Sequence, residues 1–391
     1  MFLALRDLRF ATGRFALMGC VVALISLLLV MLSGLTGGLA HQNTAALDSF
    51  EEQGVQRIVF GGASGQEPTA DFTQSEFTTA HRDAWAATDG VAAVEPAGVS
   101  QGRLVGLEHA VEPAPGALAP ADGVTRVDTD GVPTTGVASA SLLGLEAGSS
   151  HAPAGLAEGT VVLSQSLADE LHQGEGGTIT SSGVPLTVVD VVADSYYSHT
   201  PVAWVTTRDW AALAHSDDAD VIGTVGLASF DAGADADAVT TAADDAAHTT
   251  AATVQGSYNA LPAYTSEHGS LVLMQGFLYG ISALVVIAFL SIWTVQRTRE
   301  IAVLKALGGS TGWVLRDALT QAAFVLSVGV LVGTAAAFGL GLVAANVAPF
   351  IVDPATVLVP AAGVLVLGML GAALAVARVT RVDPLTALGG N

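Results

Sequence analysis

The chain has 391 residues, of which 51% are hydrophobic and 13% charged, and its formal net charge is −22. A composition this apolar excludes an ordinary soluble protein and indicates a protein embedded in a membrane. The negative charge excludes nucleic acid as a partner.

The N-terminal stretch, residues 1–14, mixes apolar and charged side chains in the manner of a short amphipathic helix at the cytoplasmic membrane surface. An apolar run from Phe15 to Ala40 follows and is long enough to span the hydrocarbon of a bilayer. This run exceeds the apolar core of a signal peptide, so we expect it to be retained as the first transmembrane helix.

Small residues along this first span predict close packing against another helix, which we expect to come from a second copy of the chain. The alternative is that glycine is simply common in membrane helices. The small residues are Gly19, Ser26, Gly34, Gly37 and Gly38.

Residues 41–270 are predicted to form one extracytoplasmic α+β domain. RIVFGG (57–62) suggests a strand. From Gly61 to Asp130 the hydrophobic periodicity is too weak for us to assign any helix or strand. Further on, strands are expected at VVLS, TITSS, PLTVVDVV and VAWVTT, and helices at SQSLADELH, RDWAALAH and Ala232–Ala252. The single cysteine, Cys20, lies in the first span, so no disulfide forms within the chain.

Three more apolar runs predict transmembrane helices at 271–295, 314–347 and 356–377. The apolar part of the helix at 314–347 begins at Ala318. Nine of the fourteen Lys and Arg residues lie beside one set of span ends, whereas 31 of the 36 acidic residues lie in the large insert. Short loops rich in Lys and Arg stay in the cytoplasm. We therefore expect both termini, including the tail 378–391, to be cytoplasmic, and the insert and the loop 348–355 to be outside.

Between the second and third spans, residues 296–313 (QRTREIAVLKALGGSTGW) form a charged segment that two membrane helices hold at the cytoplasmic surface. Such a segment is suited to docking a cytoplasmic partner that moves both helices. The alternative is a basic loop that only sets membrane topology.

Several kinds of catalytic site have no support in the sequence. A phosphate-binding loop needs lysine after glycine, but Lys305, the only lysine, follows Leu304. The nine histidines show no HExxH or other close metal-ligand spacing, and no cysteine lies outside the spans to act as a nucleophile. No ionisable residue lies deep inside a span, which argues against ion-coupled transport. We therefore predict a non-catalytic membrane subunit without a permanently bound cofactor or metal. If transport is powered by ATP, a separate subunit must hydrolyse it.

Polar and ligating side chains gather near the outer ends of the first two spans. This set suits an amphipathic ligand with a flat apolar body and acidic edges, although ordinary packing and interfacial anchoring also explain it. The residues are Met31, His41, Glu51, Arg57, Met274, Gln275 and Tyr279.

The order of one span, a large exterior domain and three spans, with REIAVLKALGGS after the second span and RVDPLTALGG after the fourth, resembles the MacB/FtsX-type ABC transporter permeases. The resemblance implies a homodimer in contact with membrane lipid, bound to two copies of an ATPase that holds the ATP, and mechanotransmission to the exterior domain. The implied ATPase contacts are Glu300, Ile301, Leu304, Lys305, Leu307 and Gly308, together with the PxxAL residues Pro384, Ala387 and Leu388.

Within that family, the modest exterior domain resembles those of Gram-positive haem exporter permeases. Haem would then be the cargo, with Arg57 pairing to a propionate and axial ligands chosen from Met31, His41, Glu51, Met274 and Tyr279. Three functions follow: an exporter of an amphipathic compound, best represented by haem; an ABC-driven signalling subunit that controls cell-wall hydrolysis or sensing; and a membrane-anchored exterior binding module without an ATPase.

Overall fold

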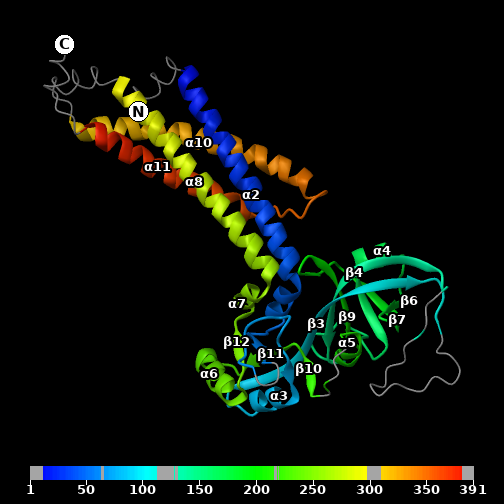
Figure 1. Cartoon of the computed structure of the whole chain (residues 1–391). Coiled ribbons are helices and arrows are strands. Elements are labelled where there is room, and N and C mark those ends of the chain that lie inside the picture. Colours follow the sequence, from blue (N-terminus) through cyan, green and yellow to red (C-terminus); the bar gives the residue numbers. More distant parts are fainter. Residues whose placement is uncertain are drawn as a thin grey trace, which may run out of the picture. The chain divides into compact units, whose positions relative to one another are not determined.

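The computed structural model describes residues 12–62, 66–111, 127, 131–214, 218, 220–296 and 310–380. Contacts between residues divide the chain into two compact units (Figure 1). Met1–Leu39 and Glu267–Asn391 form the first, here called the membrane unit, and Ala40–Ser266 form the second, here called the inserted unit. The predicted N-terminal amphipathic helix lies almost wholly outside the described residues.

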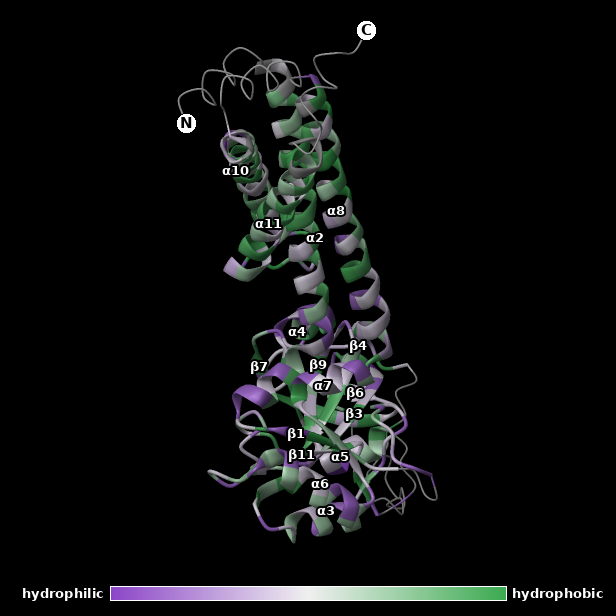
Figure 2. Ribbon diagram, turned by 90° about the vertical axis from the view of Figure 1, so that its left-hand side faces the viewer, coloured by the Kyte–Doolittle hydropathy of each residue, from purple (hydrophilic) through white to green (hydrophobic). Residues whose placement is uncertain are grey.

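The membrane unit is built from helices that are long and apolar enough to cross a bilayer, as predicted. They are α2 (Thr12–Glu52), α8 (Pro262–Gln296), α10 (Thr311–Ala344) and α11 (Pro354–Thr380). Figure 2 shows that hydrophobic residues, in green, occupy much of the length of α2, α10 and α11. Helices α2 and α8 extend beyond the predicted spans, and the last residues of α2 and the first of α8 belong to the inserted unit.

Close approach of α10 to α2 depends on two glycines of α10 spaced as GxxxG. A Cβ atom on Gly333 would lie 2.1 Å from the carbonyl oxygen of Ala23, and one on Gly329 would lie 2.9 Å from that of Gly19. Only glycine therefore permits this separation of the two helix backbones, in the way small residues commonly act between membrane helices.

The glycines near residue 36 of α2 contact the loop between α10 and α11. A Cβ atom on Gly34 would lie 2.3 Å from the ring of Phe350, and one on Gly38 would lie 2.0 Å from the carbonyl oxygen of Pro349. The amide of Ile351 also donates to the carbonyl oxygen of Gly34 at 3.1 Å. The expectation that these glycines face a second copy is therefore wrong, because this chain's own loop covers them.

Side-chain caps define the starts of α10 and α11. Ser310 has an extended backbone (φ −74°, ψ 148°), and its hydroxyl accepts from the amide of Trp313. At α11, Asp353 Oδ1 accepts from the amide of Thr356 at 2.7 Å, and the Thr356 hydroxyl accepts from the amide of Asp353 at 3.1 Å. Pro354 then occupies the first helical position, where its missing N–H costs nothing.

The inserted unit combines a large mixed sheet with short helices, which confirms the predicted α+β class. Its strands are β1 (Arg57–Phe60), β2 (Phe77–Thr78), β3 (Val91–Leu107), β4 (Thr134–Leu145), β5 (Thr160–Ser164), β6 (Thr178–Ser181), β7 (Val184–Val192), β8 (Tyr196–Tyr197), β9 (Thr200–Thr206), β10 (Val221–Gly223), β11 (Val225–Phe230) and β12 (Thr250–Ala252). Its helices are α3 (Thr79–Ala86), α4 (Gln165–Leu171), α5 (Thr207–Leu213), α6 (Ala236–Ala247), α7 (Val254–Ser257) and the 3-10 turn η1 (Tyr258–Ala260).

Six of these strands close into a ring, because β3 pairs with both β4 and β6. The order is β3-β4-β9-β5-β7-β6, and β6 returns to β3 through Val105↔Thr180 and Leu107↔Thr178. The β4–β9 and β5–β7 pairs are parallel, and the others are antiparallel. Leu104, Leu142, Val161 and other buried residues form the apolar core associated with the ring.

The first part of β3 continues the sheet outward through β11, β1 and β12. Alternation along β1 separates two cores, as expected for a strand covered on both faces. Ile58 and Phe60 join Phe50 of α2 in one apolar cluster, whereas Val59 joins Trp85 of α3 and residues of α6 in another.

Most elements predicted after Gly159 are confirmed, namely β5, α4, β6, β7, β9 and α5, and so is β1. The helix predicted over Ala232–Ala252 is shorter: α6 ends at Ala247, His248 adopts a left-handed conformation (φ 52°), and Thr250–Ala252 form β12. Between residues 61 and 130, where no element was assigned, the structure contains β2, α3 and β3.

Candidate functional site

The residues predicted to contact an ATPase lie outside the described part of the chain. This applies to Glu300, Ile301, Leu304, Lys305, Leu307 and Gly308, and to Pro384, Ala387 and Leu388. The structure describes their neighbours Gln296, in α8, and Ser310, which caps α10. The docking segment therefore stays a prediction.

Three of the predicted ligand-binding residues lie in the membrane unit. Met31 is half-buried on α2, and Met274 on α8 is 47% exposed. Tyr279 is half-buried on α8 and packs over Gly363 of α11, where a Cβ atom would lie 2.7 Å from its ring. Met274 is therefore the member of this trio most open to lipid or to another molecule.

Helices α2 and α8 are joined by a polar contact next to Met274. The side-chain amide of Gln275 donates to the hydroxyl of Thr36 at 3.1 Å, and that hydroxyl donates to the carbonyl oxygen of Leu32 at 2.7 Å. Thr36 is buried, and such interhelical hydrogen bonds fix the register of neighbouring membrane helices. Gln275 thus has a structural partner in α2, which leaves Met274 as its exposed neighbour.

His41 and Glu51 lie on the part of α2 that belongs to the inserted unit, and both are exposed. The side-chain amide of Gln255 lies 3.5 Å from Glu51 Oε2. One turn earlier, Asp48 accepts a hydrogen bond from the hydroxyl of Tyr258. Burial, together with this hydrogen bond to Asp48, raises the pKa of Tyr258, so the phenol stays protonated and continues to donate.

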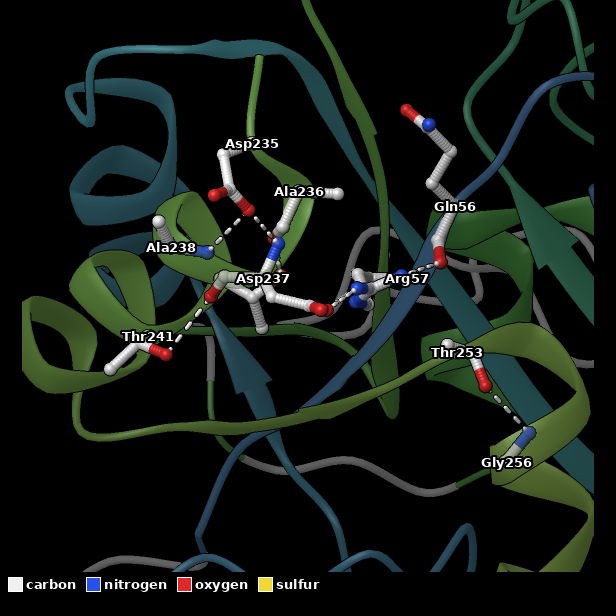
Figure 3. A network of polar contacts seen from close by, with 10 residues as sticks. Gln56, Arg57, Asp235, Ala236, Asp237, Ala238, Thr241, Thr253 and Gly256 are labelled. Atoms are coloured by element: carbon white, nitrogen blue, oxygen red, sulfur yellow. Dashed lines mark hydrogen bonds and ion pairs between the residues drawn. The ribbon is translucent and has the colours of Figure 1, made fainter.

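Arg57 has partners within the inserted unit (Figure 3). Its Nη2 lies 2.6 Å from Asp237 Oδ1, its Nη1 donates to the carbonyl oxygen of Gln56 at 3.0 Å, and its guanidinium lies 5.8 Å from the ring centre of Phe230. The Arg57 side chain is 11% exposed and that of Asp237 is 94% exposed. A ligand carboxylate would have to compete with or join Asp237, a partner far away in sequence that sequence reasoning missed.

Histidine and carboxylate side chains in the described ranges do not assemble a metal site: no group of three or more His, Cys, Asp or Glu among them is placed to hold an ion. The six predicted ligand-binding residues divide between the two units, with Met31, Met274 and Tyr279 in one and His41, Glu51 and Arg57 in the other. Each unit therefore contains three of these residues.

Two protein-family profiles match the chain. The MacB-like periplasmic core domain matches residues 16–252, and the FtsX-like permease C-terminal domain matches residues 272–384. The chain belongs to the MacB/FtsX-type ABC transporter permeases. The inserted unit of this permease is accordingly its large periplasmic-type domain, set between the first and second transmembrane helices.

The permease is also similar to curated proteins named "Putative hemin transport system permease protein HrtB". The protein from Staphylococcus epidermidis ATCC 12228 is 28% identical over 131 residues, and that from Staphylococcus haemolyticus is 32% identical over 130 residues. These matches cover 34% and 33% of the permease and 37% of each relative. The matched stretch is thus little more than a third of either relative's length.

The solved structures to which the permease is similar include two exterior domains. The periplasmic region of MacB from Actinobacillus actinomycetemcomitans is 14% identical, with a TM-score of 0.33 over 51% of the permease and 89% of that chain. The extracellular domain of the noncanonical ABC-type transporter YknZ from Gram-positive bacteria is 12% identical, with a TM-score of 0.32 over 51% of the permease and 98% of that chain.

Family membership confirms the predicted fold class and family. Proteins of this family are permease subunits, generally non-catalytic, and an ABC permease implies an ATPase partner. The number of ATPase copies, the homodimer, the membrane orientation and the six ligand-binding residues stay predictions.

Proposed function

We propose that the permease is the transmembrane subunit of an ATP-driven exporter that expels an amphipathic compound, with haem as the specific cargo. In this proposal two permease copies bind two ATPase copies through the segment that contains Leu304, and mechanotransmission carries the effect of ATP hydrolysis to the inserted unit. The observation that carries the choice of haem is the similarity to relatives named as hemin transport permeases.

The chemistry of the membrane unit supports haem as cargo. A flat apolar macrocycle partitions into lipid, and a thioether at the lipid-facing surface is a suitable axial ligand for its iron. Met274 is exposed on α8 beside the buried contact that joins α8 to α2. Met31, on α2, is the second thioether of this set.

The charge distribution supports an orientation with the inserted unit outside. The basic residues concentrated beside one set of span ends favour the cytoplasm. In that orientation the segment 296–313 is cytoplasmic, where an ATPase can reach it.

Haem titration of the purified permease tests the cargo. We expect a Soret band that shifts or weakens in Met31→Leu and Met274→Leu variants, because leucine keeps the volume and removes the sulfur ligand. Met369→Leu, a change at a half-buried methionine of α11, is the matched control and should leave the spectrum unchanged. No spectral change with the native permease would remove haem as cargo, and unchanged spectra in both variants would remove these two ligands.

Co-purification tests the energy source. An ATPase should be retained by the native permease and lost from a Leu304→Asp variant, because a buried carboxylate disfavours an apolar contact. Retention of the ATPase by this variant would refute the proposed docking segment. Normal haem tolerance with disturbed wall remodelling in cells that lack the gene would favour the signalling function instead.

A further inference from the structure

The inserted unit contains a cavity of about 700 Å³ that none of the predicted ligand-binding residues lines. This volume falls in the range typical of small-molecule sites. Its apolar wall includes Phe72, Val99, Tyr197, Trp210 and Leu261. The cavity thus lies entirely within one compact unit.

Aromatic packing holds this wall in place. The rings of Phe72 and Tyr197 meet edge to face at 5.7 Å, and Phe72 also meets Phe60 of β1 at 5.0 Å. Trp210 packs against Gly98 and Gly144, a pair of facing glycines in β3 and β4 where added Cβ atoms would lie 2.1 Å and 2.4 Å from the tryptophan. The wall is therefore preformed, which lowers the entropic cost of binding.

The charged groups of the cavity are all acidic. Glu76 and Asp218 contribute to its lining, which contains no Lys, Arg or His among the described residues. Asp71 lies close enough to Tyr197 to assist burial in raising the pKa of that phenol. The carboxylates give the cavity a negative potential, which disfavours anionic ligands and favours cations.

Two polar groups of the wall have no hydrogen-bond partner within the described ranges. They are the indole N–H of Trp210, a residue that is 3% exposed, and the hydroxyl of Ser100. Neighbouring atoms cover both, so a ligand acceptor reaches either one only after a small side-chain shift. Buried donors without partners carry an energetic cost that a suitably placed acceptor relieves.

We propose that this cavity binds an organic cation with an apolar, aromatic body. The aromatic wall would contact the body of the ligand, and Glu76 and Asp218 would neutralise its charge. This ligand class differs in charge from haem, whose propionates are anionic. The inference does not depend on the proposed cargo, because it concerns binding to the inserted unit alone.

A pair of probes of similar shape and opposite charge tests the proposal: tetraphenylphosphonium and tetraphenylborate. Each is titrated calorimetrically into the full-length permease in a neutral detergent, with detergent-only titrations subtracted. We expect the cation to bind and the borate not to bind. Glu76→Gln should weaken cation binding by about threefold, as expected for a partly exposed charge pair.

A second variant and a matched control separate the cavity from other surfaces. Ala214→Trp places a large side chain at an exposed position of the lining and should weaken cation binding by about tenfold or more. Glu170→Gln removes one exposed carboxylate outside the lining and should have no effect. Unchanged melting temperatures would show that the variants are folded.

Equal binding of the borate would overturn the proposed charge preference. Unchanged cation binding in both Glu76→Gln and Ala214→Trp would overturn the site, because the probe would then bind elsewhere on the permease. Haem titration reports on the membrane unit in separate samples, so either proposal can fail while the other stands.

Discussion

The contact between α2 and α10 makes a sharp prediction for a single added methyl group. In Gly333→Ala the new Cβ would lie 2.1 Å from the carbonyl oxygen of Ala23, a distance that must grow to at least 3.0 Å. A backbone oxygen cannot rotate away as a side chain does, so the two helices must separate. Gly339→Ala, on the same helix, is the matched control because a Cβ atom there would meet nothing within 4 Å.

The expected magnitudes follow from two opposing effects. Replacing glycine by alanine within a helix stabilises the helix by about 1 kcal/mol, and both variants share this gain. Overpacking a close contact costs about 1 to 3 kcal/mol, and only Gly333→Ala bears that cost. The control should therefore be as stable as the native permease or more stable, and Gly333→Ala should be less stable than the control by about 1 to 3 kcal/mol.

Thermal unfolding of the full-length permease in detergent measures the difference, with tryptophan fluorescence and gel filtration as parallel readouts. Scan rates must match, because membrane-protein unfolding is often irreversible and the apparent melting temperature is then kinetic. Equal melting temperatures for the two variants would refute the reasoning, as they would show that α10 does not approach α2 this closely.

Two further predictions concern the inserted unit. Burial lowers the pKa of His81 below its ordinary value of 6.5, and His81 Nδ1 accepts from the amide of Thr78 at 3.2 Å, a role that only the unprotonated nitrogen can fill. The inserted unit should therefore lose stability as the pH falls from 6.5 through the lowered pKa. His81→Gln keeps a hydrogen-bond acceptor at this position and should flatten the dependence of the melting temperature on pH. An unchanged slope in this variant would contradict the role given to His81. Trp85→Phe removes a buried 2.8 Å hydrogen bond to the hydroxyl of Thr249 and should lower the free energy of unfolding by about 1 to 3 kcal/mol, measured with denaturant. Trp313→Phe, at a 43% exposed position, should cost little. Equal effects of the two variants would contradict the stabilising role of the Trp85 hydrogen bond.

The sequence predicted the parts of the fold whose pattern is local. Long apolar runs located the four membrane helices, and the stretch after Gly159 alternates clearly enough to locate its strands and helices. Strand β3 was missed because Gly98, Gly102 and Gly106 interrupt its pattern, although pairing with three other strands stabilises it. Such pairing overrides weak intrinsic preference, and a single sequence does not display it.

For the candidate site, too, the sequence predicted local features and missed contacts between residues that are distant in the chain. Residue types near the span ends could be selected from the sequence, but the ion pair between Arg57 and Asp237 joins residues distant in the chain. The contact of Gly34 with Phe350 was likewise invisible before the fold was known. The GxxxG spacing of Gly329 and Gly333, by contrast, was a readable signal for close helix packing that the sequence analysis did not use.

The cap at Ser310 has a mechanical consequence for an ATP-driven permease. Because this residue leaves the helical region of backbone space, α10 starts afresh at Thr311 and is not a continuation of whatever precedes it. A displacement of residues 297–309 would therefore reach α10 across a break at Ser310 rather than along one continuous helix. Under the proposed docking of an ATPase at residues 296–313, stiffening or loosening the break at Ser310 would alter how much of the displacement reaches the third transmembrane helix.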